Sequence, residues 1–192
     1  EAGKKHNLMV IAPAHHRRIQ AGILSWGQDL DHEHNPFQCN LGYQVSLSGK
    51  GEWEKKGDYI GKQALEKMKA DLKDGHKPYK LQLVGFEIGG KPIDEYAPDF
   101  WLVSPGDGGD PCGFITSPWY HPEKGKNIAM GYIPFDGTLN SNGFPKWELG
   151  KKFKVHLPDI YADEPGVPVD AVTVDVPFTE SFNANTREVV KG

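Results

Sequence analysis

The most constraining feature of this sequence is a succession of short apolar segments in its second half, separated by clusters of Gly, Pro and Asp. Apolar residues at near-alternate positions place one face of a strand toward a core. Several such strands at short intervals predict a small antiparallel β-sandwich or β-barrel. A hairpin turn is expected at Gly89-Gly90, after the first strand. The predicted strands cover residues 81–88, 100–103, 112–116, 128–133, 153–157 and 169–176.

A helix is predicted directly ahead of this β-region. Asp58 can accept a hydrogen bond from an exposed N–H at the start of a helix. Lys69 and Lys73 lie near the expected C-terminal end, where the helix dipole favours cations, and Gly75 ends the helix. The apolar face of this helix would consist of Ile60, Ala64, Leu65, Met68 and Leu72.

The first 55 residues predict mixed α/β structure that is too short to hold a core alone. Residues 8–11 and 41–47 have the apolar patterns of strands. Between them, residues 17–31 begin basic and become amphipathic, and they break at Gly27 into an acidic, His-rich turn. Helical spacing in that segment is shown by Ile19, Ile23 and Leu24.

Composition excludes several classes of function. The 192 residues are 38% hydrophobic and 25% charged, with a formal net charge of -4, which is no electrostatic basis for binding nucleic acid or an anionic membrane. No apolar run approaches the roughly 20 residues of a membrane helix, and no signal peptide is visible. Cys39 and Cys112 form no disulfide framework, so free thiols in the cytoplasm are expected.

Two other clusters allow competing interpretations. Metal-compatible side chains crowd residues 29–34, where His32 and His34 would lie on one side of a strand, but a solvated acidic turn is the favoured interpretation and no metal site is predicted. Lysines around Trp53 and Tyr59 could form a nucleic-acid patch, but the interspersed glutamates favour a solvated helix side.

Four segments in order, at residues 17–31, 56–65, 113–133 and 176–178, carry motifs that resemble those of the folate-dependent aminomethyltransferase family, whose parent is the T-protein of the glycine cleavage system. Residues 17–31, RRIQAGILSWGQDLD, resemble its R-[IL]-E-[AS]-G-[IL]-x-x-[YW]-G-x-D segment, and residues 56–65, KGDYIGKQAL, resemble its K-x-D-F-I-G-[KR]-x-A-L. Residues 113–133 resemble its G-x-[IV]-T-S and IA-[ML]-G-[YF]-[IV] motifs, and residues 176–178 resemble its closing x-P-F. The segment Asn35-Pro-Phe-Gln-Cys39 is similar to the dimethylsulfoniopropionate demethylase branch.

The resemblance implies an α+β chain: a remnant of an α/β folate-binding core (residues 1–55), a linker helix (56–78) and a small antiparallel β-barrel (79–192). It implies that the chain is the C-terminal half of a longer protein, whose N-terminal half would be its partner. The family's catalytic Asp and pterin-binding Glu precede this segment, so no catalytic residue is assigned.

The resemblance also implies tetrahydrofolate as the cofactor. Arg18 matches the family arginine that helps to bind folate, and Trp26 matches an aromatic position that could stack on a flat ring. Gln20 replaces the family's Glu. If that Glu takes part in a charged network with Arg18, the replacement weakens the network; if it only caps or packs, Gln can take its place. His121-Pro122 replaces the family's Ser-Pro and is expected to be a turn.

Three functions from different classes remain open at this point. The first is one-carbon transfer to N5 of tetrahydrofolate from a small methyl or aminomethyl donor, with demethylation of a sulfonium compound preferred and the aminomethyl transfer of the T-protein as the alternative. In such chemistry the protein contributes mostly positioning and charge stabilisation. The second is a non-catalytic folate-binding module, and the third is a β-barrel interaction module without a ligand.

Overall fold

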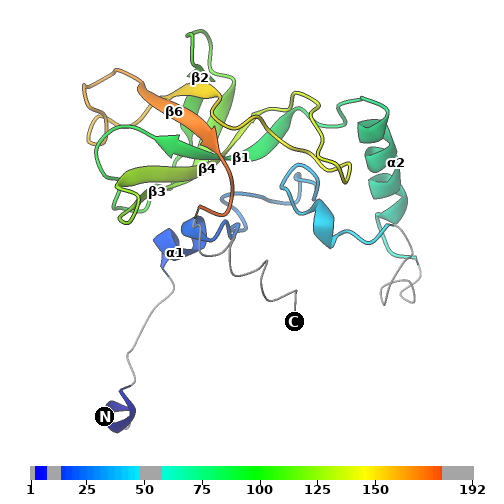
Figure 1. The fold of residues 1–192 in the computed structure, drawn as a ribbon, viewed down its shortest axis with the longest axis horizontal. Coiled ribbons are helices and arrows are strands. Elements are labelled where there is room, and N and C mark those ends of the chain that lie inside the picture. Colours follow the sequence, from blue (N-terminus) through cyan, green and yellow to red (C-terminus); the bar gives the residue numbers. More distant parts are fainter. Residues whose placement is uncertain (1–2, 8–13, 48–57, 179–192) are drawn as a thin grey trace.

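Six antiparallel strands form a closed barrel in the computed structural model, which describes residues 3–7, 14–47 and 58–178 (Figure 1). Around the barrel the order is β1-β4-β3-β2-β5-β6, and β1 closes it by pairing with β6. The strands are β1 (Leu81–Ile88), β2 (Trp101–Pro105), β3 (Gly113–His121), β4 (Lys126–Pro134), β5 (Lys152–Val155) and β6 (Val169–Val174). The barrel prediction is therefore confirmed.

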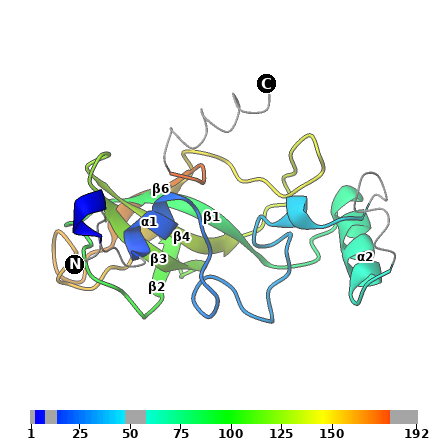
Figure 2. The same ribbon diagram turned by 90° about the horizontal axis from the view of Figure 1, so that it is seen from below.

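In the described part of the chain, helices are few and lie outside the barrel. Two short 3-10 helices occupy Lys4–His6 and Gly42–Gln44, and the α-helices are α1 (His15–Gln20) and α2 (Lys62–Lys73). Both views place α1 beside the barrel and α2 at the far end of the molecule (Figure 2). None of the helices in residues 3–7, 14–47 and 58–178 is long and apolar enough to cross a membrane. The described chain is thus mostly β, with little helix.

The hairpin expected at Gly89-Gly90 is wrong. Gly90 does have a positive φ of 86°, but the chain does not return as a strand beside β1. The neighbours of β1 are β4 and β6, and the Gly89 N–H donates to the carbonyl of Asp170 instead. Barrel closure requires this long-range pairing, because it satisfies both edges of β1.

The strand expected at residues 41–47 is also wrong. The chain forms a 3-10 turn there, with Gln44 N–H donating to the Leu41 carbonyl and Val45 N–H to the Gly42 carbonyl. Gly42 is buried between two aromatic rings, and a Cβ there would lie 2.8 Å from a carbon of Phe144. Tertiary packing therefore overrides the alternating pattern. The strand expected at residues 8–11 lies outside the described residues.

The two α-helices end where glycine allows it. In α1 the N–H of Gly22 donates to the Ile19 carbonyl and that of Ile23 to the Arg18 carbonyl, which is the Schellman arrangement, and Gly22 has a φ of +67°. The helical spacing predicted through Leu24 is therefore wrong beyond Gln20. Ile19 is buried, whereas Ile23 is exposed.

The structure confirms helix α2 at the predicted position. It also confirms that the helix ends at Gly75, whose φ is +83°. The expected cap by Asp58 is wrong, because Gly61 occupies the N-cap position and the Asp58 carboxylate accepts from the N–H of Tyr59. Ile60 is fully exposed, while Leu72 packs with Phe37 and Phe135.

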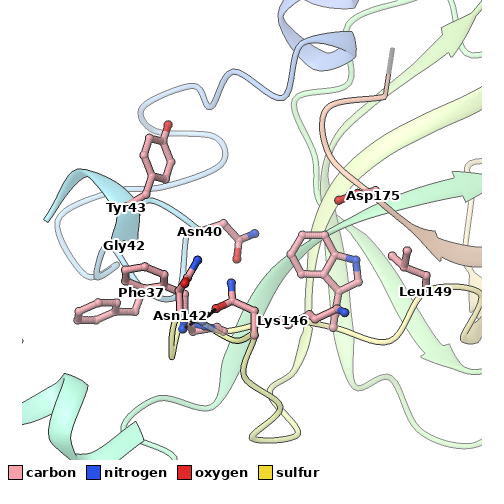
Figure 3. Close-up of a pocket in the computed structure, with 12 residues that line it drawn as sticks. Phe37, Asn40, Gly42, Tyr43, Asn142, Lys146, Leu149 and Asp175 are labelled. Atoms are coloured by element: carbon pink, nitrogen blue, oxygen red, sulfur yellow. Dashed lines mark hydrogen bonds between the residues drawn. The ribbon is translucent and has the colours of Figure 1, made fainter. Parts of the chain in front are cut away.

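Residues 14–47, which we call the strap, run along the outer wall of the barrel and onward to α2 (Figures 1 and 2). Where the strap faces the loop between β4 and β5, a cleft of about 510 Å³ remains between them (Figure 3). Its two walls come from strap residues near Asn40 and from loop residues near Asn142.

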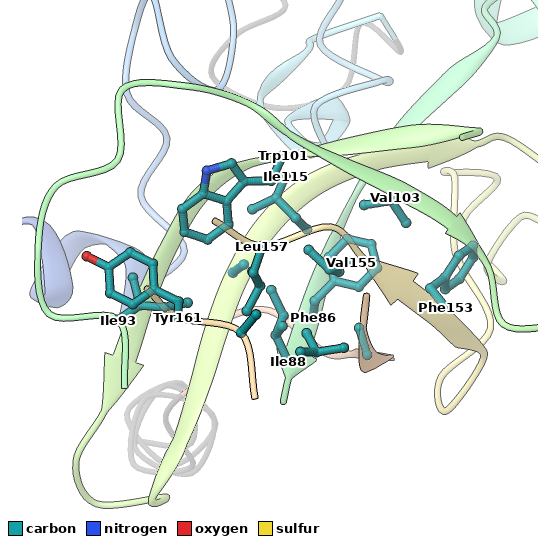
Figure 4. Close-up of a cluster of buried hydrophobic side chains, with 14 of the residues drawn as sticks. Phe86, Ile88, Ile93, Trp101, Val103, Ile115, Phe153, Val155, Leu157 and Tyr161 are labelled. Carbon is teal, nitrogen blue, oxygen red and sulfur yellow. The ribbon is translucent and has the colours of Figure 1, made fainter. Parts of the chain in front are cut away.

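Apolar side chains form three clusters in the described residues. The largest fills the barrel, where Phe86 and Phe153 meet edge to face with ring centroids 5.9 Å apart (Figure 4). A second cluster lies between the outer wall and the strap, around Ile19 and Tyr132, and a third lies beneath α2. Because the strap covers it, β1 is buried on both faces, whereas β6 keeps an alternating pattern of burial.

Buried His121, at the end of β3, predicts a loss of stability in acid. The residue is 2% exposed, and its Nε2 finds no hydrogen-bond partner among the residues that the structure describes. Burial lowers the pKa of His121; Glu123 and Glu87 oppose this shift and Lys124 adds to it. The folded state therefore binds fewer protons than the unfolded state as pH falls below the ordinary histidine value of about 6.5. The free energy of unfolding should fall with it, by at most about 1.4 kcal/mol per pH unit.

This expectation is checked by urea unfolding at about pH 7.5 and about pH 5.5, on either side of the unfolded pKa. The variant His121→Gln should show a smaller difference between the two conditions than the parent. The matched control is His76→Gln, because His76 is exposed after α2. An identical pH dependence in the parent and in His121→Gln would contradict the assignment.

Candidate functional site

The strap is fastened to the barrel by a buried carboxylate, Asp29. Its side chain has no exposed surface, and its carboxylate oxygens accept hydrogen bonds from four groups. One oxygen accepts from Arg18 Nη1 and from the Ser25 N–H, each at 2.8 Å. The other accepts from the hydroxyls of Thr116 and Ser117. A buried carboxylate is stable only with such compensation, so Asp29 is held in one position.

The barrel supplies its two hydroxyls through an irregularity in β3. The pairing of β3 with β4 shifts register between Ile115 and Ser117, which leaves Thr116 as an extra residue in the strand. Such a bulge lets consecutive side chains point the same way. Both Thr116 and Ser117 therefore reach Asp29. We call the four side chains of Arg18, Asp29, Thr116 and Ser117 the Asp29 latch.

Arg18, the predicted folate-binding arginine, is mostly engaged within the protein. Besides Asp29, its guanidinium donates to Ser117 Oγ at 2.8 Å, to the Ile23 carbonyl at 3.2 Å and to His15 Nδ1 at 3.3 Å. Within the described residues, four of its five N–H groups are thus used, and one N–H on Nη2 remains. The side chain keeps 16% of its surface exposed. Arg18 can therefore offer a ligand one hydrogen bond and a positive charge.

An aromatic cluster that sequence reasoning missed borders Arg18. The His15 ring lies 4.6 Å from that of Tyr96 and 6.4 Å from that of Trp119, and His16 also approaches Trp119. Burial and then the charge of Arg18 lower the pKa of His15, against an opposing effect of Asp29. A neutral His15 keeps the Nδ1 lone pair that accepts from Arg18. The only sequence signal was the pair of histidines before Arg17.

Trp26, the other predicted folate contact, lies in the turn of the strap that follows Leu24. Its side chain is 69% exposed, and its backbone forms an isolated bridge with Leu30. An exposed indole can stack on a planar ligand. The structure does not bring the Trp26 ring against any other aromatic ring among the described residues.

Gln20, which replaces the family's Glu, is not part of the Asp29 latch. Its backbone carbonyl accepts from the Phe178 N–H at 2.9 Å, and its side chain has no hydrogen-bond partner in the described residues. Of the two interpretations of this replacement, the geometry favours the one in which the residue has a packing role.

The acidic, His-rich turn is explained by local contacts. Asp29 points into the barrel wall, whereas Asp31 pairs with His34 Nδ1 at 2.8 Å and accepts from the Glu33 N–H at 2.8 Å. Backbone contacts of Glu33 and then the His34 side chain lower the pKa of Asp31. Across residues 3–7, 14–47 and 58–178, no three potential ligands gather as a metal site would require.

The two cysteines are free thiols, as expected. Cys39 is buried, with its sulfur 3.4 Å from the Tyr132 hydroxyl, which itself donates to the Asp29 carbonyl at 2.7 Å. Burial raises the pKa of both Cys39 and Tyr132. Both groups are therefore neutral near pH 7, and Cys39 is not an activated nucleophile.

Together these features define a class: a closed six-stranded antiparallel barrel with a strap fastened to its wall by a buried Arg–Asp pair. No family model matches the chain. The chain is 29% identical to an aminomethyltransferase of Thermosynechococcus vestitus over 162 residues, 84% of this chain and 35% of that protein. It is 32% identical to an aminomethyltransferase of Synechocystis sp. over 117 residues, 61% of this chain and 27% of that protein.

A solved structure has the same fold. The glycine cleavage system aminomethyltransferase T from Bartonella henselae matches 85% of this chain with a TM-score of 0.58 and 20% sequence identity, and 37% of that protein is covered. The chain thus has partial homology to glycine cleavage T-protein aminomethyltransferases and spans about a third of their length. These relatives give no support to the demethylase branch.

Proposed function

We propose that this chain is part of a folate-dependent one-carbon transferase and contributes the wall of the folate site that carries Arg18, together with the barrel. The observation that carries the proposal is the Asp29 latch. It unites the residues of two separate motifs that resemble the aminomethyltransferase family. In the part of the chain that the structure describes, it leaves one Arg18 N–H unpaired beside exposed rings. Tetrahydrofolate offers a flat ring and carboxylates to such a surface.

Aminomethyl transfer is the preferred reaction, because the relatives reported above are aminomethyltransferases. Demethylation of a sulfonium compound is the second candidate and rests on the segment from Asn35 to Cys39. Packing already accounts for that segment. Asn35 Oδ1 accepts from the Gln38 N–H at 2.9 Å, and both Phe37 and Cys39 are buried. These residues therefore add nothing that would select a methyl donor.

The proposal predicts that Arg18 contributes directly to folate affinity. Calorimetric titration of the complete gene product with tetrahydrofolate should show saturable binding. Replacing Arg18 by Met should raise Kd by about tenfold or more, because a charge-assisted hydrogen bond is lost. Arg17→Met is the matched control; it removes an exposed arginine next in sequence and should leave Kd within about twofold.

Asp29→Asn separates binding from positioning, since it weakens the Asp29 latch but keeps the Arg18 charge. If Arg18 contacts the ligand, Asp29→Asn should weaken binding less than Arg18→Met does. Equal affinity in the parent and in Arg18→Met would remove Arg18 from the site. A complete gene product that shows no saturable binding would end the folate proposal. Production of methylenetetrahydrofolate from an aminomethyl donor, rather than of methyltetrahydrofolate from a sulfonium, would distinguish the two reactions.

A further inference from the structure

The cleft between the strap and the β4–β5 loop has the size and construction of a small-molecule site. Its volume of about 510 Å³ lies within the usual range for such sites. It shares no lining residue with the Asp29 latch or with Trp26. Its lining includes Gly42 of the strap and, from the loop, Asn140, Asn142, Phe144, Lys146 and Trp147.

The loop wall of the cleft is held rigid by its own hydrogen bonds. Leu139 and Pro145 form a bridge across the base of the loop, and the Asn140 N–H donates to the Phe144 carbonyl at 2.8 Å. Asn140 Oδ1 in turn accepts from the N–H groups of Asn142 and Phe144. The loop therefore does not depend on a ligand for its shape, which lowers the entropic cost of binding.

Two aromatic rings of the loop wall, Phe144 and Trp147, are fixed in place. Trp147 Nε1 donates to the Val174 carbonyl at 3.0 Å, which orients the indole. The Phe144 ring stacks on the buried ring of Phe37, with centroids 6.4 Å apart. Gly42 makes this approach feasible, because a Cβ there would lie 2.9 Å from a carbon of Phe37. Rings held in this way can contact a planar ligand.

On the loop wall, the Asn142 side-chain amide makes no hydrogen bond within the described residues, so it offers a ligand both a donor and an acceptor. The oxygen of the Asn140 amide is occupied, so its nitrogen is the group left for a ligand. No carboxylate of the described residues lies within ion-pair distance of Lys146, and Figure 3 shows Lys146 and Asn142 on this wall. Asp175 supplies a carboxylate elsewhere on the lining. Donors and a cation on an aromatic-lined wall match a planar anion.

We infer that this cleft binds a planar aromatic carboxylate, with the ring beside Phe144 and Trp147 and the carboxylate at Lys146 and the Asn140 amide. The site is separate from the proposed folate surface at Arg18. Lys146 is exposed, so its contribution is charge recognition at the rim of the cleft.

A pair of matched probes tests this inference without knowledge of the natural ligand. The whole chain is titrated with 2-naphthoate and with its neutral amide, 2-naphthamide, and the Trp147 indole N–H resonance is followed by NMR. We expect saturable binding, with the carboxylate bound about tenfold more tightly than the amide. Lys146→Met should remove that preference, whereas Lys152→Met, at an exposed lysine of β5, should preserve it.

A second variant and a competitor keep the test decisive. Asn142→Trp fills the cleft without removing the charge and should weaken both probes about equally, with an unchanged far-UV spectrum as evidence of folding. Saturating tetrahydrofolate should not displace naphthoate. The inference fails if neither probe saturates, if Lys146→Met retains the preference for the carboxylate, or if tetrahydrofolate competes. None of these outcomes depends on whether Arg18 binds folate.

Discussion

Replacing Asp29 by Ala should lower the free energy of unfolding by about 3–5 kcal/mol, because it leaves the largely buried Arg18 charge without its partner. The hydroxyls of Thr116 and Ser117 and the Ser25 N–H would lose an acceptor at the same time. Because an ordinary domain is stable by about 5–15 kcal/mol, this loss would be a large fraction of the total. Urea unfolding followed by far-UV circular dichroism measures it.

The series around this position tests the mechanism. Asp29→Asn should cost less than Asp29→Ala, since an amide can still accept from Arg18 while the hydroxyls turn to accept from its nitrogen. Asp31→Asn is the matched control, because Asp31 pairs with His34 at the surface, and it should change stability by less than about 1 kcal/mol. The double variant Arg18→Met with Asp29→Ala should cost less than the sum of the single changes. Strict additivity would show that the two side chains do not act as a pair.

Replacing Phe86 by Ala should cost about 3–5 kcal/mol, because it leaves a cavity at the centre of the barrel. Phe86 has no exposed surface and meets Phe153 edge to face (Figure 4). The matched control is Phe100→Ala, which makes the same substitution at an exposed position. Phe100 is 50% exposed and stacks on Phe114, so its loss should cost about 1 kcal/mol or less.

Guanidinium unfolding of the two phenylalanine variants beside the parent gives both values. The slope of the free energy with denaturant should be unchanged if both variants still unfold from the same closed barrel. Equal losses for Phe86→Ala and Phe100→Ala would contradict a core enclosed by six strands.

The Asp29 latch also explains why separate motifs of the sequence belong together. Arg18 and Gly22 come from the end of α1, Asp29 from the following turn, and Thr116 and Ser117 from β3. Gly22 lets the chain leave α1 at the angle that brings Asp29 back toward Arg18, and a Cβ at Gly22 would collide with Val176. The motifs are thus the parts of one junction between the strap and the barrel.

The domain boundaries at residues 55 and 78 stay predictions, as do the folate contacts of Arg18 and Trp26. The expectation that an N-terminal half is the partner of this chain also stays a prediction. The chain covers about a third of the length of these relatives, whereas the resemblance implied about half.

What the sequence by itself determined is local: the apolar periodicity of the six strands, the position of α2 with Leu65, Met68 and Leu72 on its packed face, and its end at Gly75. These follow from backbone geometry and side-chain period, which act over a few residues. Only the tertiary structure decided that β1 pairs with β6 instead of forming a hairpin at Gly90, that residues 41–47 turn instead of extending, and that Asp29 is buried against β3. Each depends on contacts between residues far apart in the chain, where closing sheet edges and satisfying a buried charge outweigh local propensity.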